Sequence, residues 1–327
     1  MGDSVMQSQQ FQDLLNAIPV LTSQQRNTLI NALSEHNSPS DIAKSIEESF
    51  VRAPKCPHCG SEDIQRWGMR NQRQRFRCKA CRKTLNSFSK TPLARLRHPE
   101  RWPQYLEGMT HSLTLRPAAR QCNISLKTSF RWRHRFLQAI EHDQAPELSG
   151  IMELDETFFR ESFKGQKKGL PRAARKRGND KKTECRQIAI MVARDRDNQT
   201  VDGILENQSA DELCRHLNGR INIEAVVCAD ASLAHEKLAR TLGFTFKELV
   251  SSSGIRVIEG IFHLQRVNAY HSHLKQWITG IFHGVATKYL SHYLGWRRAL
   301  TGINALTTDR LANKILEFIH FQPLKAT

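Results

Sequence analysis

Four of the eight cysteines in this 327-residue chain form two Cys-X-X-Cys pairs, Cys56 with Cys59 and Cys78 with Cys81. Each pair places two thiolates on one tight turn, so two pairs supply the four corners of a tetrahedron, and thiolates favour zinc over magnesium or calcium. The segment between the pairs is long enough for a β-hairpin that brings the two turns together. The alternative is that the two Cys-X-X-Cys pairs occur by chance or that one of them is a redox motif. This is disfavoured because a redox Cys-X-X-Cys motif rarely occurs together with a second one. The sequence therefore predicts a structural zinc ribbon.

The expected hairpin of this ribbon carries arginines interleaved with aromatic residues. Arg73 and Arg75 stand among them, close to Trp67 and Phe76. Such a mixture suits contact with phosphates and stacking on bases. A solvated charged face is the alternative interpretation. We expect Arg73 and Arg75 to bind DNA.

Two acidic residues end apolar runs in the second half of the chain. Asp155 follows the run in GIMELDETFF, and Asp230 follows the run in EAVVCAD. In α/β proteins, functional residues commonly lie at strand ends, beside an open crevice of the sheet. Two carboxylates at such positions can hold divalent metals for phosphoryl transfer. Alternation is expected to place Glu153 and Glu156 on the other face from Asp155. The alternative is that both aspartates cap the helices that follow.

A third set of polar residues has helical spacing. Asn268, His271 and Lys275 recur at i, i+3 and i+7, which predicts one helical face, and His263 lies just upstream. This density of His, Lys and Asn is unusual for a merely solvated helix. A basic surface helix that touches DNA is the compatible alternative.

The elements that must position these residues change character along the chain. Residues 98–142 predict three helices, with a turn at Asn123 and Ile124 and a cap at Ser125 before a basic helix that carries Arg131 and Arg135. A short helix, a turn and a basic helix are typical of a helix-turn-helix, although a plain three-helix bundle fits as well. From residue 150, short β-branched runs alternate with helical stretches, which indicates an α/β fold. A basic arm between residues 160 and 186 interrupts them.

The overall charge favours a nucleic-acid partner. Lys and Arg number 49 against 32 acids, a formal charge of +17. A surplus of this size indicates a polyanionic partner, of which nucleic acid is the first choice and a membrane surface the weaker one. No apolar run approaches the roughly 18 residues of a membrane span, and we see no signal peptide.

With these motifs in order, the chain resembles a bacterial insertion-sequence transposase of the DDE type, in the group with an N-terminal zinc ribbon and an RNase-H-like catalytic domain. LDET at residues 154–157 matches the first catalytic strand and CAD at residues 228–230 the second. In the third block, HLQRVNAYHSHLK, His263 and Lys275 match, and Asn268 fills the position of the catalytic Glu. Glu259 is the rival third acid, and the motif register favours Asn268.

The resemblance implies a domain order: a helical segment 1–50, a zinc ribbon 51–92, a helix-turn-helix 93–146 and an α/β RNase-H-like catalytic domain 147–327. It implies a transposase that binds terminal inverted repeats, cleaves DNA and transfers the strand, as a cytoplasmic, nucleoid-associated homo-oligomer with transposon ends and target DNA as partners. Its cofactors would be structural Zn²⁺ and catalytic Mg²⁺ or Mn²⁺. The catalytic set would be Asp155, Asp230, Asn268 and Lys275, with His271 touching DNA. A regulator without catalysis and a metal-dependent nuclease are the alternatives.

Overall fold

The computed structural model describes residues 8–20, 22, 25, 42–71, 73–166, 168–171, 186–250, 257–301 and 307–321. Residues 172–185 of the basic arm lie outside this set. Near the N-terminus, α1 (Ser8–Ala17) runs into a 3-10 turn, Ile18–Val20, and α3 spans Ile42–Arg52. Within the described residues, no helix is long and apolar enough to cross a membrane.

The ribbon is a small antiparallel sheet of β1 (Ile64–Arg70), β2 (Arg73–Cys78) and β3 (Thr84–Leu85). It has little apolar surface to bury, and its core contains two of the cysteines themselves, together with Phe76 and Leu85. Helix α3 closes this core because the ring of Phe50 lies 5.1 Å from that of Phe76. So small a core cannot hold a fold alone, which makes the cysteine cluster important for its stability.

Three helices follow the ribbon, and they match the expected short-helix, turn, basic-helix order. A 3-10 turn (Pro99–Arg101) leads into α4 (Trp102–Thr110), α5 (Leu115–Gln121) and α6 (Leu126–Ile140). Asn123 makes the sharp turn between α5 and α6 in a left-handed conformation (φ 48°), which Asn tolerates better than most residues. The hydroxyl of Ser125 accepts a hydrogen bond from the backbone of Thr128 and caps α6, as predicted.

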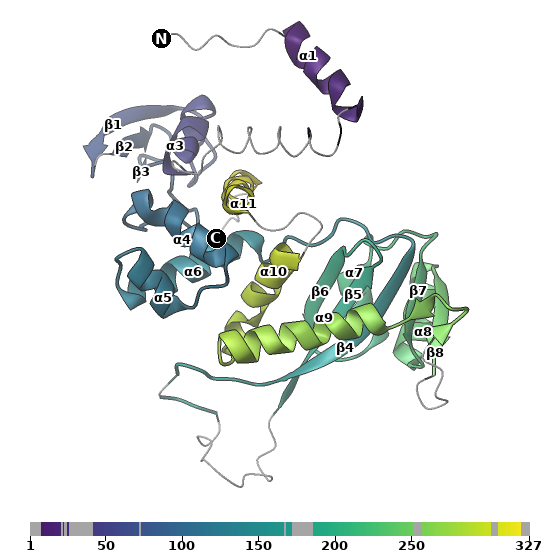
Figure 1. Ribbon diagram of the computed structural model, residues 1–327. Coiled ribbons are helices and arrows are strands. Elements are labelled where there is room, and N and C mark those ends of the chain that lie inside the picture. The colour runs from purple at the N-terminus through teal and green to yellow at the C-terminus, as the bar shows by residue number, and fades with distance from the viewer. Residues whose placement is uncertain are drawn as a thin grey trace.

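A five-stranded mixed sheet forms the α/β part (Figure 1). It contains β4 (Ile151–Arg160), β5 (Gln187–Asp195), β6 (Thr200–Leu205), β7 (Val226–Asp230) and β8 (Thr245–Leu249) in the spatial order β6-β5-β4-β7-β8. The first three strands form an antiparallel meander, whereas β7 and β8 run parallel to β4. Three antiparallel strands followed by two parallel ones are the topology of an RNase-H-like domain, so the α/β prediction is confirmed.

The two faces of this sheet are covered by different helices. Helices α7 (Ala210–Leu217) and α8 (Leu233–Leu242) pack on one face, where Met152 and Leu154 of β4 lie in their core. Helix α9 (Gln265–Gln276) lies across the other face and packs on β4 and β5 through Val267 and Leu274 (Figure 1). A short hairpin, β9 (Val257–Ile258) with β10 (Phe262–His263), precedes α9, and a π-helical turn, Trp277–Ile281, extends it.

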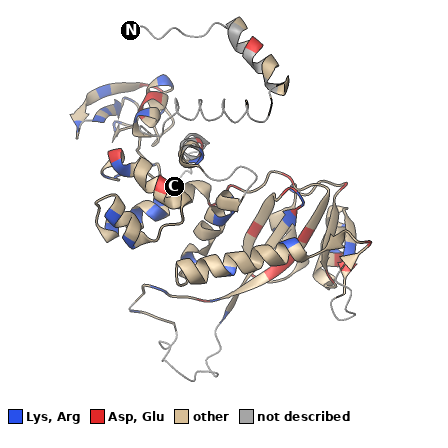
Figure 2. Cartoon of the chain, in the orientation of Figure 1, with Lys and Arg blue, Asp and Glu red and all other residues tan. Residues whose placement is uncertain are grey.

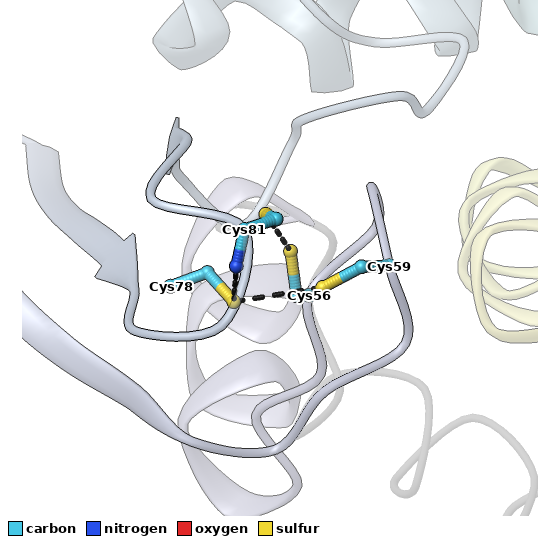
Figure 3. A group of neighbouring side chains, drawn as sticks. All are labelled: Cys56, Cys59, Cys78 and Cys81. Atoms are coloured by element: carbon cyan, nitrogen blue, oxygen red, sulfur yellow. Dashed lines mark hydrogen bonds between the residues drawn. The ribbon is translucent and has the colours of Figure 1, made fainter.

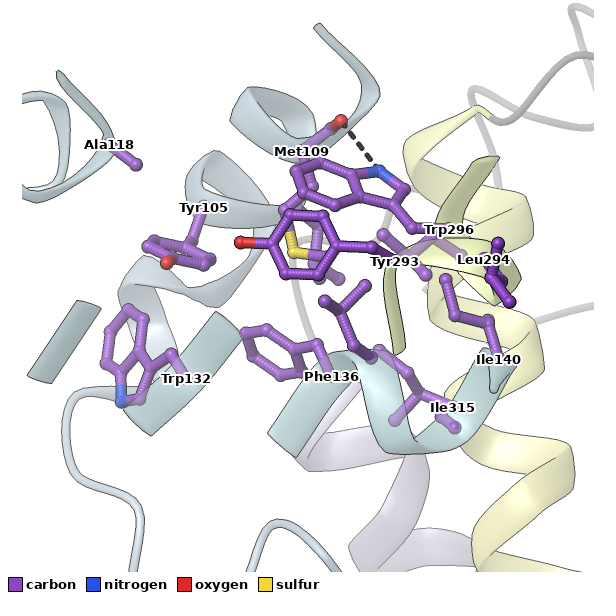
Figure 4. Packing of buried hydrophobic residues seen from close by; sticks show 14 of the residues in the cluster. Tyr105, Met109, Ala118, Trp132, Phe136, Ile140, Tyr293, Leu294, Trp296 and Ile315 are labelled. Carbon is purple, nitrogen blue, oxygen red and sulfur yellow. Dashed lines mark hydrogen bonds between the residues drawn. The ribbon is translucent and has the colours of Figure 1, made fainter. Parts of the chain in front are cut away.

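The last helices connect the sheet to helices α4–α6. After a 3-10 turn (Thr287–Tyr289), α10 (Leu290–Thr301) and α11 (Thr308–Phe321) both pack on α6, and α11 also contacts α4 and α3. Figure 4 shows the core that results, in which Trp132 and Phe136 of α6 share one cluster with Trp296 of α10 and Ile315 of α11. The basic helices and the sheet are therefore joined by a continuous hydrophobic cluster.

A buried ion pair reinforces this connection. The guanidinium of Arg298, on α10, pairs with the carboxylate of Asp202 on β6, and it also donates to the backbone carbonyls of Glu141 and Asp143 after α6. Asp202 accepts a further hydrogen bond from Tyr270 of α9. Because all of these groups are buried, removing one partner would leave an uncompensated charge, a loss that typically costs 3–5 kcal/mol.

Candidate active site and metal centre

The four cysteines of the ribbon come together as predicted. Figure 3 shows their side chains converging from two turns, with the sulfurs of Cys56 and Cys81 3.7 Å apart and those of Cys59 and Cys78 3.6 Å apart. A tetrahedral Zn²⁺ with Zn–S bonds of about 2.3 Å requires sulfurs about 3.8 Å apart. The backbone N–H of Cys81 points at the sulfur of Cys78, and the pKa of that thiol is lowered mainly by this bond. The cluster could therefore hold a metal ion.

The two aspartates lie in register on neighbouring strands. Strands β4 and β7 are parallel, and their last paired residues are Glu153 and Cys228. Asp155 and Asp230 each lie two residues further along, so both carboxylates start from the same face of the sheet on strands about 4.8 Å apart. Asp230 ends β7 as expected, whereas Asp155 does not end its strand, because β4 continues to Arg160. The first acid therefore lies mid-strand, where its backbone is fixed by pairing with Val192 of β5.

The environment of Asp155 disfavours its negative charge. Burial is the largest cause that raises the pKa of this carboxyl to about 6. The backbone N–H of Glu156 lowers the pKa, whereas the nearby carboxylates of Glu156 and Asp230 raise it. A divalent cation between the carboxylates would remove that repulsion, and carboxylate oxygens are the ligands that Mg²⁺ and Mn²⁺ prefer. The donor set therefore fits a divalent metal.

His235 of α8 links the acids of the two strands. Its Nδ1 atom lies 2.7 Å from Oδ1 of Asp230, and its Nε2 atom lies 3.1 Å from Oε1 of Glu156. Burial lowers the pKa of this imidazole, but the two carboxylates outweigh burial, so that its pKa is raised overall. Sequence reasoning did not select His235, although a histidine five residues after Asp230, on the helix that follows, was a usable signal.

Glu153 anchors α9 over the same face. It lies two residues before Asp155 and therefore on the same side of β4, so the expectation that Glu153 points to the opposite face is wrong; only Glu156 does. Its buried carboxylate accepts from the backbone N–H of Val267, 2.9 Å away, and pairs with Arg196 and His263 at 2.9 and 3.1 Å. An acid at the first turn of a helix is favourable, so Glu153 fixes where α9 begins.

Helix α9 divides the three residues expected on one face. Asn268 and Lys275 are exposed, whereas His271 is buried, with its Nδ1 atom 3.7 Å from Oδ2 of Asp155. Burial, together with the charge of Lys275, lowers the pKa of His271 to about 4. The prediction that His271 contacts DNA does not agree with this position, because the imidazole is turned toward Asp155.

The candidates for a third acidic ligand differ in position. Glu259 lies in the turn between β9 and β10, where it pairs with Lys247 at 2.7 Å. Among the described residues, the four cysteines are the one group in which three or more Cys, His, Asp or Glu ligand atoms lie within 4.8 Å of one another. Within the described residues, Asp155 and Asp230 therefore do not form so tight a group with a third residue of these types.

The arginines expected to contact DNA line two adjoining concave surfaces. A cavity of about 1500 Å³ lies between the ribbon and the helices, and a second one of about 480 Å³ lies beside it, against α6. Arg73, Arg75 and Arg135 line the first cavity, and Arg131 lines the second. Both share the segment from Arg95 to His98. Figure 2 shows Lys and Arg on the ribbon strands and on α5 and α6, whereas the strands of the sheet carry Asp and Glu together with Lys and Arg.

Comparison with known proteins finds a family match over the part of the chain that contains Asp155 and Asp230. Residues 147–297 match the family described as ISXO2-like transposase domain. The chain is also 26% identical over 247 residues to an uncharacterized protein in transposable element ISH50 of Halobacterium salinarum, a match that covers 73% of this chain and 82% of that relative.

Solved structures similar to the chain include a pre-cleavage Mos1 transpososome and the Mos1 strand transfer complex. Both are 13% identical; the match covers 67% of this chain in each, and 77% and 79% of the respective Mos1 chains. The TM-scores are 0.24 and 0.23, and values this low do not establish a shared fold.

Proposed function

We propose that the chain, whose residues 147–297 match the family described as ISXO2-like transposase domain, binds the terminal inverted repeats of an insertion sequence, cleaves DNA there and transfers the strand to a target. The observation that carries the proposal is the pair Asp155 and Asp230, in register on one face of an RNase-H-like sheet. Acids in this arrangement suit two-metal chemistry at phosphorus.

In this proposal, Asp155, Asp230 and Asn268 hold Mg²⁺ or Mn²⁺. When bound, the metal ions supply charge stabilisation for an in-line displacement at phosphorus. Asn268 contributes an amide oxygen without negative charge. Its exposure on the helix that packs over Asp155, and the pairing of Glu259 with Lys247, support Asn268 as the third ligand. Lys275, exposed two turns further along α9, is suited to contact a DNA phosphate.

We also propose that the cysteine cluster holds a structural Zn²⁺ and that DNA lies along the two concave surfaces. The first surface gathers arginines from the ribbon, from the segment that follows it and from α6, and its lining includes the acids Glu47 and Glu100. The arginines are Arg70, Arg73, Arg75, Arg95, Arg97 and Arg135. A lining of this composition attracts a phosphate backbone.

We propose that the protein acts on DNA in the cytoplasm as a homo-oligomer, because two transposon ends must be joined to one target.

The proposal is tested on a duplex that carries the element's terminal repeat, with Mg²⁺ or Mn²⁺ present. Asp155→Asn and Asp230→Asn preserve side-chain shape but remove the charge, so each should reduce cleavage by several orders of magnitude while DNA binding stays near normal. Asp211→Asn, an exposed change on α7, is the matched control. Full cleavage by either active-site variant would refute the catalytic site, and cleavage without strand joining would indicate a plain nuclease.

A further inference from the structure

His235 is among the most deeply buried charged or polar side chains near the candidate site. Only 2% of its surface is exposed, yet both ring nitrogens meet carboxylates: Nδ1 meets Oδ1 of Asp230, and Nε2 meets Oε1 of Glu156. The Nδ1 atom also lies 3.4 Å from the backbone carbonyl of Asp230. The imidazole therefore contacts the second acid twice, at its side chain and at its backbone.

Asp230 requires such support more than Asp155 does. It is the last residue of its strand, and 48% of its side chain is exposed, so the strand alone does not fix the direction of its carboxylate. In contrast, Asp155 lies mid-strand, and its Oδ1 accepts a hydrogen bond from the backbone N–H of Glu156 at 2.9 Å. Oδ1 of Asp155 is thus held by the backbone, whereas the contact of Oδ1 of Asp230 with the protein is its ion pair with His235.

The same imidazole connects the two strands. Glu156 immediately follows Asp155 on β4, and its carboxylate lies on the α8 side of the sheet, where His235 meets it. A displacement of α8 would therefore change the position of Asp230 relative to Asp155. The contact of Nδ1 with the Asp230 carboxylate is an ion pair. Carboxylate ligands of metals are commonly oriented by outer polar partners, whose loss typically costs 10–100-fold in metal affinity or activity.

We propose that His235 is a positioning residue of the metal site: its Nδ1 side holds the Asp230 carboxylate in the orientation that receives the divalent ion, and its Nε2 side ties α8 to Glu156. The inference rests on the proposed function, because it assumes that Asp230 is a metal ligand. It assigns His235 no contact with DNA and no transfer of a proton.

Two amide substitutions separate the two sides of the ring. In His235→Asn the amide nitrogen takes the place of Nδ1 and keeps the contact with Asp230, whereas in His235→Gln it takes the place of Nε2 and keeps only the contact with Glu156. The matched control is His216→Gln, which removes a partly buried histidine that faces Glu212 at 3.6 Å on α7 of the same domain. Asp230→Asn is the control for loss of the ligand itself.

The readout is binding of Mn²⁺ to the full-length, zinc-loaded protein, measured from the electron paramagnetic resonance signal of free Mn²⁺, with thermal unfolding of each variant alongside. We expect His235→Gln to weaken Mn²⁺ binding about tenfold or more. His235→Asn should bind close to wild type, and His216→Gln should bind as wild type. In the cleavage assay, the Gln variant should need more Mg²⁺ for half-maximal rate, and its affinity for DNA should not change.

A folded His235→Gln protein that binds Mn²⁺ like wild type would overturn the inference. So would equal losses in the Asn and Gln variants, since these would show that the ring is required only for packing of α8. If wild type binds no Mn²⁺, or if Asp230→Asn binds it unchanged, the proposed metal site itself fails, which is a different result from failure of the positioning role alone.

Discussion

Replacing Asp155 by Asn should stabilise the metal-free protein at neutral pH. The pKa of Asp155 is raised from 3.8 to about 6 by burial and by the neighbouring carboxylates. A carboxyl with a higher pKa in the folded than in the unfolded chain binds its proton more tightly when folded. Its penalty on the free energy of unfolding is therefore absent below about pH 4, grows as the pH rises toward 6, and is complete above that.

The size of this penalty follows from the shift. About two pKa units at 1.36 kcal/mol each give roughly 3 kcal/mol, a large part of the 5–15 kcal/mol that stabilises a typical protein. The side chain of Asp155 is 24% exposed, so solvent screens this charge only partly. An isosteric amide has no charge to desolvate. Asp155→Asn should therefore raise the melting temperature at pH 8 by on the order of 5 °C.

The assay is thermal unfolding of zinc-loaded protein in buffer free of other divalent metals, from pH 4.5 to pH 8. The advantage of Asp155→Asn should shrink as the pH falls, and Mn²⁺ should raise the melting temperature of wild type far more than that of the variant. Asp211→Asn, at a side chain that is 84% exposed, should have no effect. An Asn variant no more stable than wild type at pH 8, or an advantage independent of pH, would refute the reasoning.

Three further predictions concern the remaining sites. Asn268→Ala should abolish cleavage and Glu259→Gln should leave it nearly normal, because Glu259 already pairs with Lys247; the opposite pattern in the cleavage assay would move the third ligand to Glu259. Cys56→Ser should lower the zinc content measured by metal analysis and unfold the ribbon, since metal binding supplies folding free energy there; unchanged zinc would contradict the site. Arg131→Ala with Arg135→Ala should weaken binding of terminal-repeat DNA and reduce the slope of log affinity against log salt by about 0.9 per lost phosphate contact; an unchanged slope would exclude α6 from the interface.

Local spacing predicted much of the fold and of the candidate site. Cys56, Cys59, Cys78 and Cys81 converge because each pair defines its own turn, so little tertiary information is needed. The cap at Ser125 is equally local. The α/β class followed from short β-branched runs that alternate with helices.

The sequence patterns contain the face of Glu153 and the burial of His271, although our predictions missed both. The length of β4 depends on tertiary packing. The face of Glu153 could have been predicted, because strands alternate with period two and residues 153 and 155 share parity. The burial of His271 was visible in the spacing of Val267, Tyr270 and Leu274, which defines the packed face of α9. In contrast, the length of β4 beyond Asp155 depends on its partner β5, and no local pattern shows it.

The shared core of α6 and α11 sets the order in which the protein can become functional during translation. Helix α6 ends at Ile140 and α11 begins at Thr308. The ribosome must therefore synthesise the entire sheet before α11 is available to pack on α6. Until Leu311 and Ile315 arrive, the part of the apolar surface of α4 and α6 that α11 covers stays exposed on the nascent chain. A message truncated before α11 would therefore yield basic helices that lack part of their core, instead of a stable fragment that occupies DNA without cutting it.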